Sequence, residues 1–192
     1  AHENGFREVH EEEIPHLRTL DTKHLIRELR VSKRKIPMLL TKGRSLLKSR
    51  IRELPLIKGM EATLPTLRNE AEFFGILTSN AAENVEAFLD AHGLSDLFSF
   101  ISTTNKLTSK AKHLRSIART FSLEAPQMLY VGDEIRDVRA ARKAKIAAAA
   151  VTWGLNSREA LEAENPRYLV DSPAELEKIC GIPGAGPLKP GT

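Results

Sequence analysis

The chain has 192 residues, of which 41% are hydrophobic and 28% charged, a balance typical of a folded globular protein and not of a disordered one. Its longest uncharged apolar run, residues 146–155, is about half of what a membrane span requires, and the polar, acidic start shows no secretory signal. A single cysteine, Cys180, cannot build a disulfide framework, so we predict a cytoplasmic protein without a membrane partner.

The net charge of +4 is concentrated in one N-terminal stretch. Its basic residues are Lys33, Arg34, Lys35, Lys42, Arg44, Lys48, Arg50 and Arg52. Such a stretch attracts anions, although a solvated helical face without a ligand explains the same residues equally well. No aromatic residues lie between the basic ones, so we do not expect nucleic acid as a partner. Nothing in the sequence indicates the oligomeric state.

The pattern of residues 1–55 is helical. Asp21 is a plausible N-cap for a helix with apolar residues at three- and four-residue spacing. A second helix is predicted from Ser32 to Ile51, and Pro37 either lies in its first turn or breaks it. We therefore predict a helical lobe over residues 1–55. The first residue is Ala1, and we expect the chain to be a piece of a longer protein.

After Pro55 the pattern alternates between short apolar runs and helices. The predicted strands are residues 73–78, 98–102, 127–131, 146–152 and 168–170. The predicted helices are residues 60–69, 81–92, 109–120, 134–145, 157–164 and 173–180. This alternation predicts an α/β fold with a doubly wound, Rossmann-like parallel sheet over residues 56–180. Residues 181–192 are rich in glycine and proline, and we expect a disordered tail.

Two of the predicted strand ends carry groups that suit a phosphate ester. Thr78, Ser79 and Asn80 follow the first strand, where hydroxyls and free amides could hold phosphoryl oxygens, although these residue types are also standard N-caps. Lys106 and Lys110 lie before or at the start of the helix after the second strand. A lysine is unfavourable at a helix N-terminus, which suggests a compensating use, although an isolated lysine is usually a solvated surface residue.

The strand end with the strongest signal is the segment VGDEIRD. Gly132 permits a tight turn, and Asp133, Glu134 and Asp137 follow it. Three carboxylates this close at a strand end suit a hard cation such as Mg²⁺. Helix capping and a favourable dipole interaction explain the same residues without a metal.

Together the three segments resemble motifs of the haloacid dehalogenase superfamily of phosphohydrolases. The resemblance rests on GILTSN, Lys110 and VGDEIRD in this order, and it covers residues 59–180. The segments AVTWGLNS and YLVDSPAEL are similar to the phosphoglycolate-phosphatase-like branch. The resemblance implies that the helical lobe is a cap over the active site.

The resemblance also implies a role for each matching residue. Thr78 would bind a phosphoryl oxygen, helped by the amides near Ser79 and Asn80, and Lys110 would neutralise charge on the nucleophile and the phosphoryl group. Asp133 would bind Mg²⁺, and either Glu134 or Asp137 would complete its coordination. The substrate would be a small phosphorylated metabolite.

The family's first motif, two aspartates separated by one residue, is missing from this chain. In the family it ends a central strand of the sheet and supplies the nucleophile and the general acid. We therefore expect a Mg²⁺-dependent phosphatase acting through an aspartyl phosphate, with this chain an inactive fragment of it. A non-catalytic binding module is the alternative, and a receiver-like signalling domain is disfavoured by the helical lobe.

Overall fold

The computed structural model describes residues 7–104 and 110–180. The first part forms a helical lobe with the elements η2 Glu11–Glu13, α1 Ile14–Leu17, α2 Thr22–Glu28, η3 Lys33–Lys35, α3 Ile36–Arg50 and η4 Ile51–Glu53. The rest alternates between α4 Met60–Glu70, β1 Gly75–Thr78, α5 Ala82–Ala91, η5 Ser95–Leu97, β2 Phe100–Thr103, α6 Lys110–Thr120, η6 Ala125–Gln127, β3 Leu129–Gly132, α7 Ile135–Ala144, β4 Ala147–Val151, α8 Arg158–Glu162, β5 Tyr168–Val170 and α9 Pro173–Cys180.

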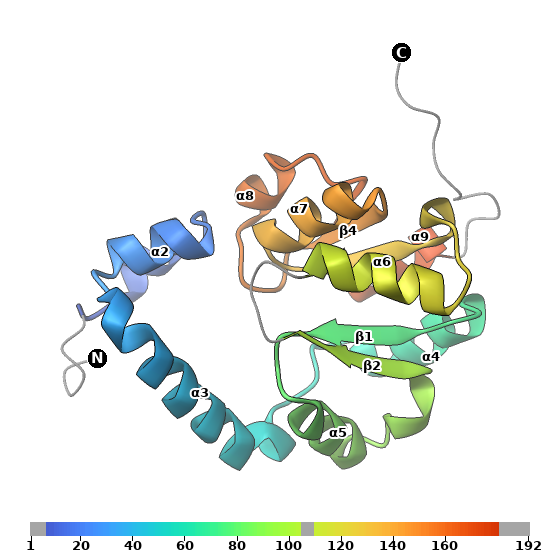
Figure 1. Cartoon of the computed structure of the whole chain (residues 1–192), viewed down its shortest axis with the longest axis horizontal. Coiled ribbons are helices and arrows are strands. Elements are labelled where there is room, and N and C mark those ends of the chain that lie inside the picture. Colours follow the sequence, from blue (N-terminus) through green and yellow to red (C-terminus); the bar gives the residue numbers. More distant parts are fainter. Residues whose placement is uncertain (1–6, 105–109, 181–192) are drawn as a thin grey trace.

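Local signals explain the two main helices of the lobe. The Asp21 carboxylate accepts hydrogen bonds from the backbone N–H groups of Lys23, at 3.1 Å, and His24, at 3.0 Å, which makes it the N-cap of α2 as predicted. Pro37 lies in the first turn of α3, where a missing N–H costs no hydrogen bond. No residue of α3 is buried, and this helix stands away from the rest of the molecule (Figure 1).

The strands form two parallel sheets. Strand β1 pairs with β2, and β4 lies between β3 and β5. Helix α6 packs against α7 and β1, and α4 packs against α9, so helices connect the two sheets. This arrangement confirms the predicted doubly wound α/β fold with a helical lobe. No helix within the described residues is long and apolar enough to span a membrane.

A gap separates β1 from β3. Within the described residues, no strand pairs with the free edge of either. A cavity of about 670 Å³ lies there, and its lining includes Ile76 and Leu77 from β1 and Tyr130 and Val131 from β3. Val131 is 39% exposed, whereas Ala150 in the neighbouring β4 is fully buried. The gap fits the predicted missing strand, which stays a prediction.

The domain boundary also stays a prediction. Residues 54–59 contain no helix or strand between η4 and α4, which agrees with a lobe over residues 1–55 and a core over 56–180. Ile51 in η4 is buried, and η4 contacts α5, so the end of the lobe rests on the core. The predicted disordered tail, residues 181–192, lies outside the described residues.

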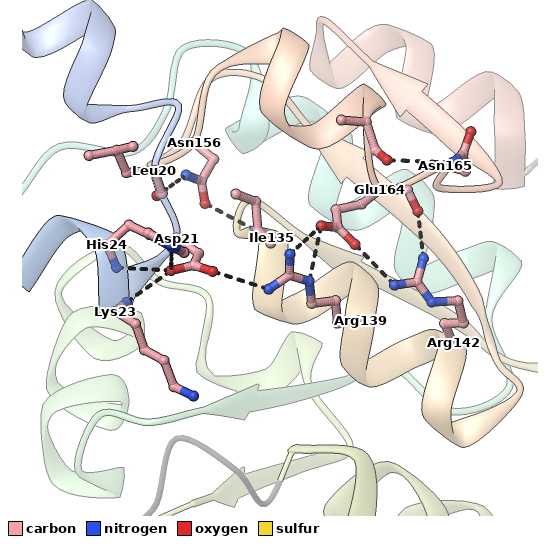
Figure 2. A network of polar contacts seen from close by, with 11 residues as sticks. Leu20, Asp21, Lys23, His24, Ile135, Arg139, Arg142, Asn156, Glu164 and Asn165 are labelled. Carbon is pink, nitrogen blue, oxygen red and sulfur yellow. Dashed lines mark hydrogen bonds and ion pairs between the residues drawn. The ribbon is translucent and has the colours of Figure 1, made fainter.

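Polar contacts join the start of the lobe to the core (Figure 2). Arg139 of α7 forms ion pairs with Asp21, at 3.3 Å, and with Glu164, at 2.6 Å. Hydrogen bonds from the backbone N–H and side chain of His24, together with Arg139, lower the pKa of Asp21 from 3.8 to about 2. The Arg139 guanidinium likewise lowers the pKa of Glu164.

The replacement Asp21→Asn tests this contact. Asparagine caps a helix almost as well as aspartate but cannot pair with Arg139, so we expect a loss below about 1 kcal/mol, as for an exposed ion pair. Because the folded-state pKa lies below 3.8, the wild-type advantage is full at neutral pH and declines as the pH falls toward about 2. Urea unfolding of both proteins across this range measures it. An advantage that is independent of pH would contradict the ionic contact.

Candidate active site

The carboxylates predicted as metal ligands meet between β3 and α7. Asp133 and Glu134 directly follow β3, and Asp137 lies in the first turn of α7. One oxygen atom from each lies within 4.8 Å of the others. Three negative charges this close repel one another unless cations lie among them. The structure therefore brings together the three residues that the sequence placed at this strand end.

One of the three carboxylates, Asp137, forms a buried ion pair. Lys110, the first residue of α6, forms a buried ion pair with Asp137, and the two residues are 8% and 4% exposed. The hydroxyl of Tyr130 donates a 3.4 Å hydrogen bond to the same carboxylate. Burial and the nearby charge of Asp137 raise the pKa of Tyr130 far above its ordinary value, so the hydroxyl remains a donor. The ion pair between Lys110 and Asp137 joins the ends of two predicted strands.

The other two carboxylates differ in their surroundings. Glu134 forms a 2.5 Å ion pair with Arg136. Asp133 accepts a 2.7 Å hydrogen bond from the backbone N–H of Leu155 and has no ion pair within the described residues. Asp133 is thus the carboxylate with the most capacity for an added cation.

Glycines let the chain approach these carboxylates closely. A Cβ atom added to Gly154 would lie 2.1 Å from the Cβ of Asp133 and 2.2 Å from its Oδ2. One added to Gly132 would lie 2.5 Å from the Cβ of Asp137. Only glycine fits at these two positions without displacement. The segment with Trp153 and Gly154 therefore helps to form the site.

The predicted phosphate-binding residues after β1 make local contacts. The hydroxyl of Thr78 accepts a 3.0 Å hydrogen bond from the N–H of Asn80. The side-chain oxygen of Asn80 accepts from Ala81, at 2.9 Å, and from Asn84, at 3.0 Å, while Ser79 is exposed. Neither Ser79 nor Asn80 is the N-cap of α5, because that position is Ala81.

No hydrogen bond in the described residues joins Thr78, Ser79 or Asn80 to Lys110 or the carboxylates. Their role in binding phosphate stays a prediction. Lys106 lies outside the described residues.

Sequence reasoning missed Tyr130 and Asn156, whose partners lie on other elements. Tyr130 lies in the apolar run QMLYV. That run predicts a buried strand, but it gives no sign of the contact between Tyr130 and Asp137.

Replacing Gly154 with alanine should push Asp133 out of place. We expect a loss of about 1–3 kcal/mol in the free energy of unfolding, as for other overpacked sites. The matched control is Gly43→Ala in α3, where nothing lies within 4 Å of the added Cβ. There alanine should stabilise the helix by up to about 1 kcal/mol. Urea unfolding compares the two, and equal effects would contradict the close approach of Gly154 to Asp133.

The Lys110–Asp137 pair can be tested by a double-mutant cycle. Lys110→Met leaves Asp137 buried without a cation, which should cost about 3–5 kcal/mol. Adding Asp137→Leu removes the stranded charge, so the double variant should be more stable than Lys110→Met alone. Urea unfolding gives the coupling energy. Additive losses would show that the two side chains do not interact.

Comparison with known proteins gives the family. The model of the family described as haloacid dehalogenase-like hydrolase matches residues 1–151. A phosphoglycolate phosphatase of Synechococcus elongatus is 34% identical over 172 residues, which cover 90% of this chain and 81% of that protein. One from Haemophilus influenzae is 29% identical, over 65% of this chain and 57% of its own length.

Solved structures show the same fold. A haloacid dehalogenase-like hydrolase family protein from Streptococcus pneumoniae has a TM-score of 0.75 at 21% identity, covering 91% of this chain and 83% of its own. A predicted phosphoglycolate phosphatase from Haemophilus somnus has a TM-score of 0.71 at 17% identity, with coverages of 93% and 85%. The resemblance read from the sequence is confirmed, and the chain belongs to the haloacid dehalogenase-like hydrolase family.

Proposed function

We propose that this chain is part of a Mg²⁺-dependent phosphatase that hydrolyses a small phosphate monoester. The observation that carries the proposal is the carboxylate cluster of Asp133, Glu134 and Asp137 with Lys110 paired to it. The relatives named phosphoglycolate phosphatase make phosphoglycolate the first substrate to test. We propose a cytoplasmic location, in line with the single cysteine.

The donor set suits magnesium. Carboxylate oxygens are hard ligands, and Mg²⁺ is commonly held by one or two of them together with water and phosphate oxygens. Asp133 would hold the ion directly, because it has no ion pair in the described part of the chain. Glu134 would complete the coordination, since Asp137 is buried against Lys110. When bound, Mg²⁺ would stabilise negative charge on the phosphoryl oxygens.

The remaining residues would position and neutralise the phosphoryl group. Asp137 holds Lys110 in one orientation, so the ammonium group can stabilise charge in the transition state without rearrangement. Thr78 and the amides near Ser79 and Asn80 would bind phosphoryl oxygens at the end of β1. The helical lobe, residues 1–55, would act as a cap over the core, residues 56–180, and its basic helix would attract the anionic substrate.

The nucleophile would come from a strand between β1 and β3. We propose that its first aspartate attacks phosphorus, while the bond to the ester oxygen breaks and the second aspartate protonates the leaving alcohol. Water would then hydrolyse the aspartyl phosphate. The apolar cavity between β1 and β3 supports a strand at this place. A strand ending level with its neighbours would place both aspartates near Thr78 and Asp133.

An activity assay tests this proposal. Residues 1–192 alone should release no phosphate from phosphoglycolate or an aryl phosphate in the presence of Mg²⁺. The same chain extended by the missing strand should be active, and Asp133→Asn in that protein should lower turnover by about 100-fold or more without unfolding it. The exposed carboxylate of Asp96 offers the control Asp96→Asn, which should be fully active. Phosphate release by residues 1–192 alone would contradict the proposed nucleophile.

A further inference from the structure

The side chain of Asn156 links the core to the start of the helical lobe (Figure 2). Its Oδ1 accepts a 3.0 Å hydrogen bond from the backbone N–H of Ile135, the first residue of α7. Its Nδ2 donates to the carbonyl oxygens of Arg18, at 2.9 Å, and Leu20, at 3.0 Å. Asn156 is only 4% exposed. Both N–H groups and the oxygen of this buried amide are therefore used.

Arg18 holds the same junction from the side of the lobe. Its guanidinium donates to four carbonyl oxygens of the loop after β4, those of Thr152 at 3.2 Å, Gly154 at 2.9 Å, Leu155 at 3.1 Å and Asn156 at 3.5 Å. In return, the backbone N–H of Ser157 donates a 2.9 Å hydrogen bond to the carbonyl of Arg18. We call residues 18–21 the linker and residues 152–157 the loop. The linker cannot move without breaking contacts to the loop.

The other side of the loop holds Asp133. The N–H of Leu155 donates to Asp133 Oδ2 at 2.7 Å, and the N–H of Asn156 donates to the Asp133 carbonyl at 3.1 Å. Asn156 thus contacts the linker through its side chain and Asp133 through its backbone. A cavity of about 200 Å³, lined by Leu17, Leu20 and Leu155 among others, lies beside the linker and leaves room for it to shift.

We propose that Asn156 is a positioning residue that couples the position of the cap linker to the orientation of the Asp133 carboxylate. Displacement of the linker would pull on Nδ2, move the loop and change the hydrogen bond from Leu155 to Asp133. By thermodynamic linkage, a cation on Asp133 would in turn stabilise the linker. The effect of a cation rests on the proposed function, in which Asp133 binds Mg²⁺. The coupling between the linker and the Asp133 carboxylate does not.

An asparagine is the residue that these contacts require. Aspartate has the same shape, but its second oxygen would face the carbonyl oxygens of Arg18 and Leu20 without a proton to donate. The variant Asn156→Asp therefore changes two hydrogen bonds into repulsions with little change in volume. The matched control is Asn69→Asp, the same replacement at an exposed position of α4.

Hydrogen–deuterium exchange of residues 1–192 without metal tests the coupling. In Asn156→Asp, exchange should become about tenfold faster in the linker, in the loop and in residues 133–138, and remain unchanged in β2 and α5. In Asn69→Asp, all of these segments should exchange as in the wild type. Faster exchange in the linker alone, with residues 133–138 unchanged, would overturn the proposal.

A second variant guards against a general loss of stability. Arg18→Ala removes the guanidinium contacts to the loop and leaves the hydrogen bonds from Asn156 Nδ2 to the backbone of the linker in place. If Asn156→Asp exchanges faster everywhere, Arg18→Ala decides the question. Faster exchange in the loop and in residues 133–138 supports the coupling, and no change in residues 133–138 rejects it.

Adding Mg²⁺ separates the coupling from the proposed function. In the wild type, Mg²⁺ should slow exchange in residues 133–138 and in the linker, and in Asn156→Asp it should not slow the linker. Slower exchange of residues 133–138 without any effect on the wild-type linker would overturn the coupling. If Mg²⁺ changes exchange in neither segment, the proposal that Asp133 binds Mg²⁺ is wrong. The comparison without metal then still decides whether Asn156 couples the linker to residues 133–138.

Discussion

The buried ion pair between Lys110 and Asp137 connects the two halves of the core. Lys110 opens the helix that follows β2, and Asp137 lies in the helix that follows β3. Within the described residues no strand joins these halves, so the ion pair and the packing of helices α6–α7 and α4–α9 hold them together. Two charges taken out of water are stable only when each has its partner. The pair thereby fixes Asp137, while Glu134 pairs with Arg136 and Asp133 has no ion pair within the described residues.

Most elements of the fold could be predicted from the sequence because their signals are local. The helix expected over residues 60–69 spans Met60–Glu70, and the alanine-rich run became the central strand Ala147–Val151 of its sheet. The N-cap at Asp21 could be predicted because an aspartate stands directly before a segment with apolar residues at helical spacing. Helical spacing and capping depend on residues that are close together in the chain, so they can be recognised in a single sequence.

Contacts between distant residues could not be predicted in the same way. Asn156 bonds to a linker 136 to 138 residues earlier in the chain, and the segment AVTWGLNS, which contains it, does not indicate these partners. The sequence left open whether Glu134 or Asp137 would complete the proposed metal site, and only the fold shows that Asp137 is paired with Lys110. Thr78 matches a motif, yet its hydroxyl bonds to its own turn. A motif gives residue types and order, whereas tertiary packing sets the partners.

Two apolar surfaces of the described structure lack a cover. One is the gap between β1 and β3, where Val131 is 39% exposed, and the other is α3, where Leu40 and Leu46 are 54% and 62% exposed. A strand between β1 and β3 would cover the first of them. The same strand would supply the aspartates that the proposed chemistry needs.

The most direct test is to read the source DNA immediately upstream of the codon for Ala1. An open reading frame that encodes an apolar strand ending in two aspartates separated by one residue is the expected result, and it would complete the sheet and the catalytic site together. A start or stop codon directly before Ala1 would contradict the proposed phosphatase and would favour a non-catalytic binding module.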